Sequence, residues 1–490
     1  MANSSDVLNR RFRMLIGGKL VEAADGARFI SQNPATGEDL GSAPDGKAAD
    51  VDLAVAAAQA AQPAWRSLPL NEKQTLLREV CAALRARSEE LGLLDSLDTG
   101  NVLSAMRQDA PVGAAVIEYF LGASNEIKGE VTHLDGDLHY TRRQPFGVAA
   151  KFLPFNHPIG SLAGALAPPL LAGNCLILKP SPHTPLSALA FGETLAEILP
   201  AGVVNIITGS NEALAEPLAA HPGVPRLALQ TSIEAGRNVL RLAADHMKTV
   251  TLELGGKNPL IVFEDADVEF AASTAVAAMN FKWQAHSCSS TSRVLVHALL
   301  HDAFVARLAE LLGDLKIGSP LDPETEMGAI THRAQYDRIT SYIETGKAEG
   351  ASLVYGGTPP NDPALADGLF LTPALFTDVT PGMRIAREEV FGPVIAVMPW
   401  DDYDEMIETA NDVEYGLAAV LVTDDLNRAH LTAEALDVGY VEVNGPVSFA
   451  FGSPFGGIKQ SGMGREGGFD ELLSYTQVKS VNIRLRRDGF

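Results

Sequence analysis

The sequence predicts an α/β fold built around a doubly wound, mostly parallel sheet. Five short apolar runs between residues 147 and 254 are separated by segments with helical periodicity, and a similar series follows from Asn258. Parallel strands need a crossover connection, usually a helix, so this alternation favours βαβ units. The five runs are GVAAKFLPF, NCLILKP, GVVNIITG, PRLALQ and TVTLEL. Such a sheet has the potential to bind a nucleotide at the carboxyl ends of its strands.

Composition and charge limit the class of protein. Of the 490 residues, 46% are hydrophobic and 20% are charged, which is typical of a folded globular chain of about three domains. The formal net charge of −23 argues against electrostatic binding to nucleic acid or anionic lipid. No targeting segment or membrane span is evident, and three cysteines cannot form a disulfide framework. We therefore expect a cytoplasmic protein.

Helical periodicity predicts the elements between the strands. An Ala-rich helix, capped by Asp50, is expected to end near Pro63 because proline breaks the helical hydrogen-bond pattern. A second helix from about Asn71 places four apolar residues on one face, namely Leu77, Val80, Cys81 and Leu84. Further helices are expected at Leu186–Leu199, Arg237–Met247 and near Ala303–Leu312.

Two segments do not follow the alternation of strands and helices. VTHLDGDLHYTRR has Asp135 and Gly136 between two alternating arms, which is typical of a β-hairpin. In the tail KSVNIRLRR, the apolar residues Val481, Ile483 and Leu485 alternate with polar ones, as in a half-buried strand. Because an isolated ribbon is unstable, we expect these strands to pair, with a second subunit as one possibility.

Cys288 is the cysteine whose surroundings suggest chemistry. Cys81 and Cys175 lie in apolar patterns that are typical of small buried residues. The neighbours of Cys288, HSCSSTSR, are small and polar, which favours a thiol that ionises. This context alone leaves a nucleophile and a structural thiol as alternatives.

Six motifs decide between these alternatives. They are LPFNHP (153–158), LKPS (178–181), ELGGK (253–257), SC (287–288), EEVFGP (388–393) and SPFGGIKQSGMGRE (453–466). In this order and at these separations, over nearly the whole chain, they resemble the NAD(P)-dependent aldehyde dehydrogenase superfamily. The resemblance implies a Rossmann-type cofactor domain, an α/β catalytic domain and a small β oligomerisation arm. The expected ranges are 1–126 and 146–255 for the cofactor domain, 256–470 for the catalytic domain, and 127–145 and 471–490 for the arm.

The resemblance also implies oxidation of an aldehyde to a carboxylic acid through a covalent intermediate. Cys288 matches the nucleophile that forms a thiohemiacetal, and the Asn156 amide with the Cys288 N–H matches the oxyanion hole. Hydride loss leaves a thioester, and Glu253 matches the general base that activates water for its hydrolysis. Many acylating relatives that use coenzyme A lack this carboxylate. Such an enzyme stays an alternative, as does a catalytically idle nucleotide-binding scaffold.

NAD or NADP is the expected cofactor, although no G-x-G-x-x-G follows a strand. Instead Ser232 can cap a helix whose first N–H groups suit a pyrophosphate. Thr231 stands where the family usually has Gly, which we expect to move the backbone slightly away from the phosphates. Pro182 stands where NAD-selective members often carry a Glu, which predicts relaxed preference or a shift toward NADP. The matched residues are Pro154, Phe155, Lys179, Ser181, Pro182, Gly209, Thr231, Ser232, Gly236, Leu254, Gly255, Glu389 and Phe391.

Departures from the family pattern cluster around the substrate site. His157 replaces an aromatic residue, and Ser161 and Gly164 replace bulky residues that narrow the substrate tunnel in many relatives. We expect a widened tunnel for a medium-to-large aldehyde, with aromatic and heterocyclic aldehydes as candidates. The matched residues are His157, Ser161, Gly164, Ser287, Ser289, Phe449 and Phe455. No Arg or Lys is expected to converge on the site and pair with a second carboxylate of the substrate, and Lys282 at the mouth is only a weak candidate for this role.

The segment before the nucleophile also departs from the family. Ala285 and His286 replace the usual Gly-Gln, and for His286 a structural role is favoured over support of the thiolate. Histidine and cysteine spacings show no metal-binding pattern, so no metal is expected. The expected partners are a small-molecule aldehyde and copies of this chain in a homodimer or homotetramer, without nucleic acid or membrane.

Overall fold

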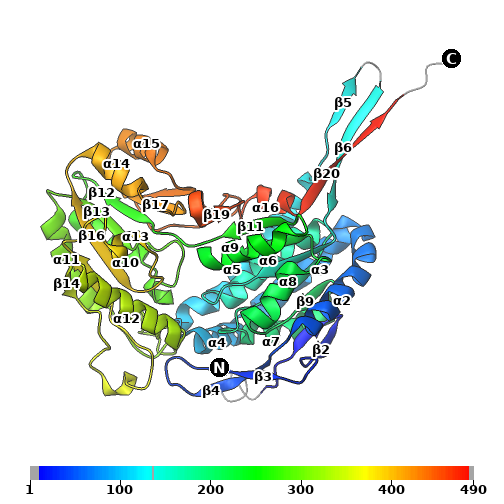
Figure 1. Ribbon diagram of the computed structural model, residues 1–490, viewed down its shortest axis with the longest axis horizontal. Helices are drawn as coiled ribbons and strands as arrows, with labels where there is room; N and C mark the ends of the chain where they lie inside the picture. The colour runs from blue at the N-terminus through cyan, green and yellow to red at the C-terminus, as the bar shows by residue number, and fades with distance from the viewer. Residues whose placement is uncertain (1–9, 135–136, 485–490) are drawn as a thin grey trace.

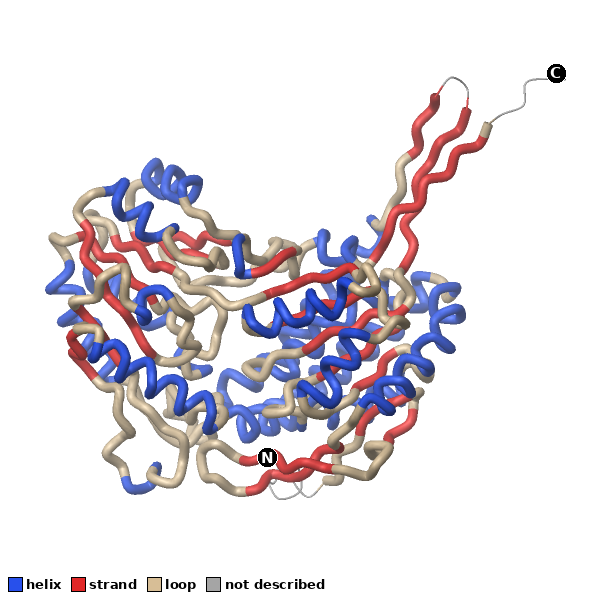
Figure 2. The backbone as a smooth tube through the Cα atoms, in the orientation of Figure 1, coloured by secondary structure: helices blue, strands red, loops and turns tan. Residues whose placement is uncertain are grey.

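The computed structural model describes residues 10–134 and 137–484. Two lobes, each built on its own β-sheet, and a three-stranded arm that projects from one lobe make up the molecule (Figure 1). Helices lie against the sheets of both lobes (Figure 2). This arrangement confirms the predicted α/β fold with a small β arm.

The first lobe contains an eight-stranded sheet of order β19-β11-β10-β7-β8-β9-β1-β2. Its strands are β1 (Met14–Ile16), β2 (Lys19–Val21), β7 (Val148–Phe152), β8 (Cys175–Lys179), β9 (Val204–Ile206), β10 (Arg226–Gln230), β11 (Thr249–Glu253) and β19 (Gly462–Met463). Strands β7 to β11 are parallel and coincide with the five apolar runs. Antiparallel β1, β2 and β19 extend the sheet at its two edges, so Glu253 at the end of β11 has a paired neighbour on each side.

Helices and short turns surround this sheet. They are α2 (Ala48–Ser67), α3 (Leu70–Ala86), α4 (Ser88–Thr99), α5 (Leu103–Ala123), η1 (Ser124–Glu126), α6 (Pro158–Leu171), α7 (Leu186–Ile198), η2 (Asn211–Ala215), α8 (Glu216–Ala220), α9 (Ile233–Ala244) and α16 (Phe469–Ser474). The predicted apolar face of α3 is buried. Helix α9 begins before the expected Arg237, because Ser232 Oγ accepts from the Ala235 N–H and caps it.

The predicted end of the first helix at Pro63 is wrong, because α2 continues to Ser67. A proline inside a helix frees the carbonyl four residues earlier, here that of Gln59. Both residues are exposed, so water can bond this carbonyl. On the other face Trp65 is buried, and its Nε1 donates to the Leu170 carbonyl of α6 at 3.0 Å. Packing of Trp65 offsets the lost hydrogen bond.

Asp50 does not cap α2 as predicted. The N-cap is Lys47, and Asp50 lies in the first turn of the helix. The Asp50 carboxylate accepts from the Lys47 N–H at 2.9 Å and from the Ala24 N–H at 2.9 Å. The Asp50 side chain therefore accepts from a backbone N–H at the start of α2 that has no partner within the helix, although Asp50 itself is a helical residue.

The second lobe contains a seven-stranded sheet of order β14-β15-β16-β13-β12-β17-β18, parallel except for β14. Its strands are β12 (Pro259–Val262), β13 (Arg293–His297), β14 (Ser352–Tyr355), β15 (Ala374–Thr377), β16 (Val394–Trp400), β17 (Ala418–Val422) and β18 (Tyr440–Val443). The helices and turns are α10 (Val268–Ala278), η3 (Phe281–Trp283), α11 (His301–Asp314), α12 (Arg333–Ala348), η4 (Pro363–Leu365), α13 (Arg384–Arg387), α14 (Tyr403–Asn411), α15 (Leu426–Ala435) and η5 (Lys459–Ser461).

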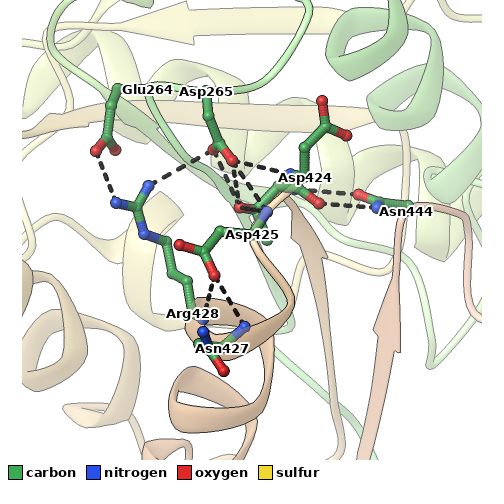
Figure 3. Close-up of polar contacts among 8 residues, drawn as sticks. Glu264, Asp265, Asp424, Asp425, Asn427, Arg428 and Asn444 are labelled. Atoms are coloured by element: carbon green, nitrogen blue, oxygen red, sulfur yellow. Dashed lines mark hydrogen bonds and ion pairs between the residues drawn. The ribbon is translucent and has the colours of Figure 1, made fainter.

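A polar network joins the carboxyl ends of β12 and β17 (Figure 3). The Asp265 carboxylate accepts from Thr423 Oγ1 at 2.8 Å and from the Asp424 N–H at 2.9 Å. Arg428 pairs with Glu264 at 2.9 Å. Asp265 thus already accepts hydrogen bonds, and Glu264 is paired with a cation. We therefore interpret the network as a structural link between the loops that follow β12 and β17.

The arm is an antiparallel sheet of order β20-β6-β5. It consists of β5 (Val131–Leu134), β6 (Asp137–Pro145) and β20 (Thr476–Ile483), and β3 (Arg28–Gln32) pairs separately with β4 (Asp39–Pro44). The predicted hairpin and tail strand are thus confirmed as neighbours within one chain. The predicted turn at Asp135 and Gly136, and Leu485 of the tail, lie outside the described residues.

The domain boundaries stay predictions. One strand belongs to one predicted domain by its position in the sequence and to the sheet of the other by its pairing. β19 lies in the range expected for the catalytic domain but pairs with β11 of the first sheet. Across 10–134 and 137–484, no helix has both the length and the apolar character that a bilayer crossing requires.

Candidate active site

Cys288 lies in the loop between η3 and β13 and is half-buried. The residue packs beside a small apolar cluster that contains Leu417, Ala418 and Phe455. Asn258 Nδ2 donates to the Cys288 carbonyl at 2.7 Å. The loop is therefore held by the segment that follows the ELGGK motif.

The resting thiol of Cys288 is protonated at neutral pH. Burial raises its pKa to about 12, and the carboxyl groups of Glu253 and Glu389 act in the same direction. The expectation that polar neighbours favour ionisation of this thiol is therefore wrong. Ser289 and Ser290 are themselves buried, so they do not supply a solvated surrounding.

Asn156 reaches the nucleophile loop from the segment before α6. Its Nδ2 donates to the His286 carbonyl at 2.7 Å, two residues before Cys288. The Asn156 carbonyl accepts in turn from Asn101 Nδ2 at 2.8 Å, which fixes the Asn156 backbone. A side-chain amide carries two N–H donors, so Asn156 keeps one for another acceptor.

Glu253 ends β11, and its side chain is buried. In the described part of the chain neither carboxyl oxygen has a hydrogen-bond partner. Burial raises the pKa of Glu253 to about 9, the charges of Glu466 and Glu471 act in the same direction, and Arg465 and Lys151 oppose them. Glu253 is thus a largely neutral acid near pH 7 with two free acceptor atoms, an arrangement suited to holding a water molecule.

A buried ionic network lies beside Glu253. The ammonium of Lys151, on β7, lies 2.8 Å from Glu466 Oε1 and 3.7 Å from Glu471 Oε1. Gln230 Nε2 donates to the other oxygen of Glu466 at 2.6 Å. The two carboxylates hold the pKa of Lys151 above its ordinary value against the effect of burial, so Lys151 stays a cation.

This network was not predicted from the sequence, although two signals were present. Lys151 interrupts the otherwise apolar run GVAAKFLPF, and a lysine in a buried strand needs a partner. Glu466 ends the motif SPFGGIKQSGMGRE but was not singled out. The pairing itself joins residues 315 positions apart, which no local pattern indicates.

The residues matched to a cofactor gather at the carboxyl edge of the first sheet. They lie at or just after the ends of successive parallel strands. Pro154 and Phe155 follow β7, Lys179 is the last residue of β8, and Ser181 and Pro182 follow it. Gly209 follows β9, Thr231 and Ser232 follow β10, and Leu254 and Gly255 follow β11. This edge is where ligands bind in open α/β sheets.

Two details of this edge bear on a dinucleotide. Lys179 is buried, its Nζ donates to Asn211 Oδ1 at 3.2 Å, and burial lowers its pKa to about 8. Asn211 was not predicted. A Cβ on Gly236 would lie 2.9 Å from the Leu254 side chain, so glycine lets α9 pack closely on the end of β11. The N–H groups in the first turn of α9 thus lie at the strand ends, where they suit an anion.

The loop of the EEVFGP motif approaches the same edge from the second lobe. Glu389 Oε1 accepts from the Gly256 N–H at 3.1 Å, and burial raises the pKa of Glu389 to about 7. A Cβ on Gly255 would lie 2.0 Å from Glu389 Oε2, so glycine lets this carboxyl group keep its position against the Gly256 N–H. Phe391 has a φ of 56°, and its carbonyl accepts from Gln335 Nε2 at 2.7 Å. Gln335, on α12, was not predicted.

An aromatic cluster connects the two lobes around Phe155. The Phe155 ring meets four others edge to face, those of His183, His286, His332 and Phe391, with centroids 5.4 to 6.4 Å apart. His183 and His332 stack at 3.8 Å between the lobes. Burial lowers the pKa of His286 to about 3, so it is a neutral packing residue. This supports its structural interpretation.

The residues matched to a substrate site fall into two groups. His157, Ser161 and Gly164 share one half-buried face of α6, while Phe455 is buried near Cys288. Ser287 Oγ and Ser289 Oγ lie 3.0 Å apart beside the nucleophile. Phe449 contacts Phe455 with ring centroids 4.7 Å apart but is 60% exposed, and Lys282 is exposed too.

In the described ranges, no group of three or more His, Cys, Asp or Glu side chains is placed to hold a metal ion.

Comparison with known proteins accounts for this arrangement. The sequence model described as the Aldehyde dehydrogenase family matches residues 20–481. The chain belongs to the aldehyde dehydrogenase family. It is 42% identical over 470 residues to a betaine aldehyde dehydrogenase of Mesorhizobium japonicum, covering 96% of each protein. It is 40% identical over 476 residues to aldehyde dehydrogenase tropH of Talaromyces stipitatus, covering 96% of this chain and 92% of that one.

Solved structures agree with this assignment. An NAD+ complex of an aldehyde dehydrogenase from Bacillus cereus matches with a TM-score of 0.96 and 35% identity, covering 99% of each chain. The fold of this aldehyde dehydrogenase is therefore the family fold, and its reaction class is the oxidation of aldehydes.

Proposed function

We propose that this enzyme oxidises an aldehyde to a carboxylic acid through a thioester on Cys288, with Glu253 as general base. One observation carries the proposal. The half-buried thiol of Cys288 lies two residues after the carbonyl that the Asn156 amide binds, and near enough to Glu253 to be affected by its charge; Glu253 is a buried carboxyl group whose oxygens have no partner in the described chain. A nucleophile, an oxyanion donor and a base are the groups that this chemistry needs.

The residues at the edge of the first sheet fit a dinucleotide. The first turn of α9 offers N–H groups for the pyrophosphate, the buried Lys179 ammonium suits ribose oxygens, and Glu389 suits the second ribose. The Bacillus cereus relative was solved as an NAD+ complex. When bound, the nicotinamide ring accepts the hydride that leaves the substrate carbon.

The protein groups then have defined roles. The Cys288 thiol gives its proton to water, its sulfur bonds to the carbonyl carbon as the carbon–oxygen π bond opens, and the free N–H of Asn156 donates to the resulting oxyanion. The amide of Cys288 itself, which faces its own sulfur, is the second donor. Glu253 next takes a proton from water as that water attacks the thioester, and the carbon–sulfur bond breaks to release the acid. Passing the acyl group to coenzyme A would not require this buried carboxyl group.

The test uses a panel of aldehydes with NAD or NADP, read by absorbance of the reduced cofactor. Cys288→Ala should abolish oxidation while cofactor binding, measured by calorimetry, is retained. Glu253→Gln should give a first-turnover burst and then block steady release. Turnover that survives in Cys288→Ala would refute the covalent route, and a parent inactive on every aldehyde would favour an idle scaffold.

Cofactor preference is a second expected property. Pro182 gives no carboxylate to hold the ribose hydroxyls of NAD or to repel the 2′-phosphate of NADP. We therefore expect comparable use of both cofactors or a preference for NADP. A hundredfold higher kcat/KM with NAD would contradict this reasoning.

The arm supports a homo-oligomer. It projects from the body, and its outer strands expose apolar side chains, with Val131 62%, Val478 57% and Ile483 42% exposed. A narrow sheet with these surfaces gains stability by pairing with a second copy. Light scattering should report a dimer or tetramer, and a monomer at micromolar concentration would contradict the proposal.

A further inference from the structure

The half-buried face of α6 carries an unusual set of residues. His157, Gly160, Ser161 and Gly164 are partly exposed, whereas the other residues of the helix are buried. Their spacing places them on one helical stripe. A Cβ on Gly164 would meet no atom within 4 Å, so there is open space above this stripe. His157 directly follows Asn156, the oxyanion donor of the proposed reaction.

His157 on this stripe is paired with a carboxylate. Its Nδ1 lies 2.9 Å from Oδ2 of Asp109 on α5, and the Asp109 side chain is only 11% exposed. A Cβ on Gly160 would lie 3.1 Å from the same oxygen, so glycine permits this close approach. Because a carboxylate accepts hydrogen bonds, His157 Nδ1 is the donor in this pair, and in the neutral imidazole Nε2 carries the lone pair.

A second polar group lies beside this pair. The Trp283 ring lies 4.8 Å from the His157 ring, and in the described chain Trp283 Nε1 is buried without an acceptor. Trp283 also precedes Cys288 by five residues, and its carbonyl accepts from the His286 N–H at 2.7 Å. The acceptor on His157 and the donor on Trp283 therefore belong to the same two segments as Asn156 and Cys288.

We propose that His157, oriented by Asp109, and Trp283 select aldehydes that carry a hydroxyl group. This inference rests on the proposed function, because it concerns the substrate of that site. A hydroxyl group both donates and accepts, so it can donate to His157 Nε2 and accept from Trp283 Nε1–H. A carboxylate has no hydrogen to donate and is repelled by Asp109, and a methyl group satisfies neither partner.

Isosteric aldehydes provide the test. The parent enzyme is assayed for kcat/KM on 2-, 3- and 4-hydroxybenzaldehyde, the three methylbenzaldehydes and 3-carboxybenzaldehyde. We expect at least one hydroxyl compound to exceed its methyl isostere by about tenfold or more, since a polar site discriminates against a substrate that leaves it unpaired. The carboxy compound should be poorer than the hydroxyl compounds.

Matched variants locate the effect. His157→Phe and Trp283→Phe keep a ring but remove one polar atom each, and both should lower the hydroxyl-to-methyl ratio toward one while retaining turnover of the methyl compounds. Asp109→Asn can donate to Nδ1 and so reverse the tautomer, and it should lower the ratio as well. Leu299→Ala, at a side chain that is 81% exposed in the second lobe, is the control that should leave the ratio unchanged.

The outcomes separate two failures. A parent that oxidises methyl and hydroxyl isosteres equally, or prefers the carboxy compound, overturns this inference and leaves the proposed function intact. A ratio that survives in His157→Phe also overturns it. A parent inactive on all these compounds and on the wider aldehyde panel overturns the proposed function itself.

Discussion

The raised pKa of Glu253 makes hydrolysis of the thioester depend steeply on pH. Burial raises the pKa of Glu253 well above its ordinary value, and the charge of Glu466 acts in the same direction, so the ionised form is the minority form at pH 7. The ionised form is the one that accepts a proton from water. The hydrolysis rate should therefore rise as the pH increases above 7 and level off only above the raised pKa of Glu253.

Neighbouring charges offer a sharper perturbation. Glu466→Gln removes a negative charge beside Glu253 and leaves Lys151 less neutralised, and both changes favour the ionised Glu253. The midpoint of the pH profile should move to lower pH, and the rate at pH 7 should increase. Lys151→Met removes the cation, so it should move the midpoint to higher pH. The two variants should thus shift the profile in opposite directions.

The assay separates this step from the others. An excess of aldehyde and cofactor gives a first-turnover burst of reduced cofactor, and the following steady rate reports thioester hydrolysis where it is limiting. Burst amplitude controls for folding and for cofactor binding in each variant. A profile that is flat from pH 6 to 9, or shifts in the same direction in Glu466→Gln and Lys151→Met, would refute the reasoning.

Two further predictions concern stability and cofactor binding. Lys151→Met leaves the buried Glu466 and Glu471 without their cation, so the free energy of unfolding, measured with urea at pH 7, should fall by about 3–5 kcal/mol. An unchanged midpoint of the urea transition would mean that the two carboxyl groups are neutral when Lys151 is absent. Gly255→Ala would place a Cβ 2.0 Å from Glu389 Oε2 and should weaken dinucleotide binding about tenfold or more by calorimetry, whereas Gly122→Ala, which meets no atom within 4 Å, should not.

Local patterns were sufficient to predict the parallel strands of the first sheet and the cap of α9. The five parallel strands could be predicted because each is a short apolar run between helical segments, and Ser232 could be predicted as a cap from its position. Pro63 misled the prediction of α2, because the helix is maintained by the contact of Trp65 with α6, and only the tertiary structure supplies that contact.

Properties that depend on burial could not be predicted. The small polar neighbours of Cys288 suggested a solvated thiol, yet folding buries them and raises the thiol pKa. The stack of His183 on His332 brings together residues from different lobes, and nothing in either local sequence indicates it. Sequence spacing identifies which groups are present, whereas their charge states follow from packing.

The pairing of Lys151 with Glu466 also bears on biosynthesis. After Lys151 the ribosome must add 315 residues to reach Glu466, which takes roughly 15 to 60 s at ordinary elongation rates. Throughout that interval the nascent β7 carries a cation whose buried counter-ions have not been made. The first sheet therefore completes its interior late, and a chaperone that shields β7 during this period would raise the yield of folded enzyme.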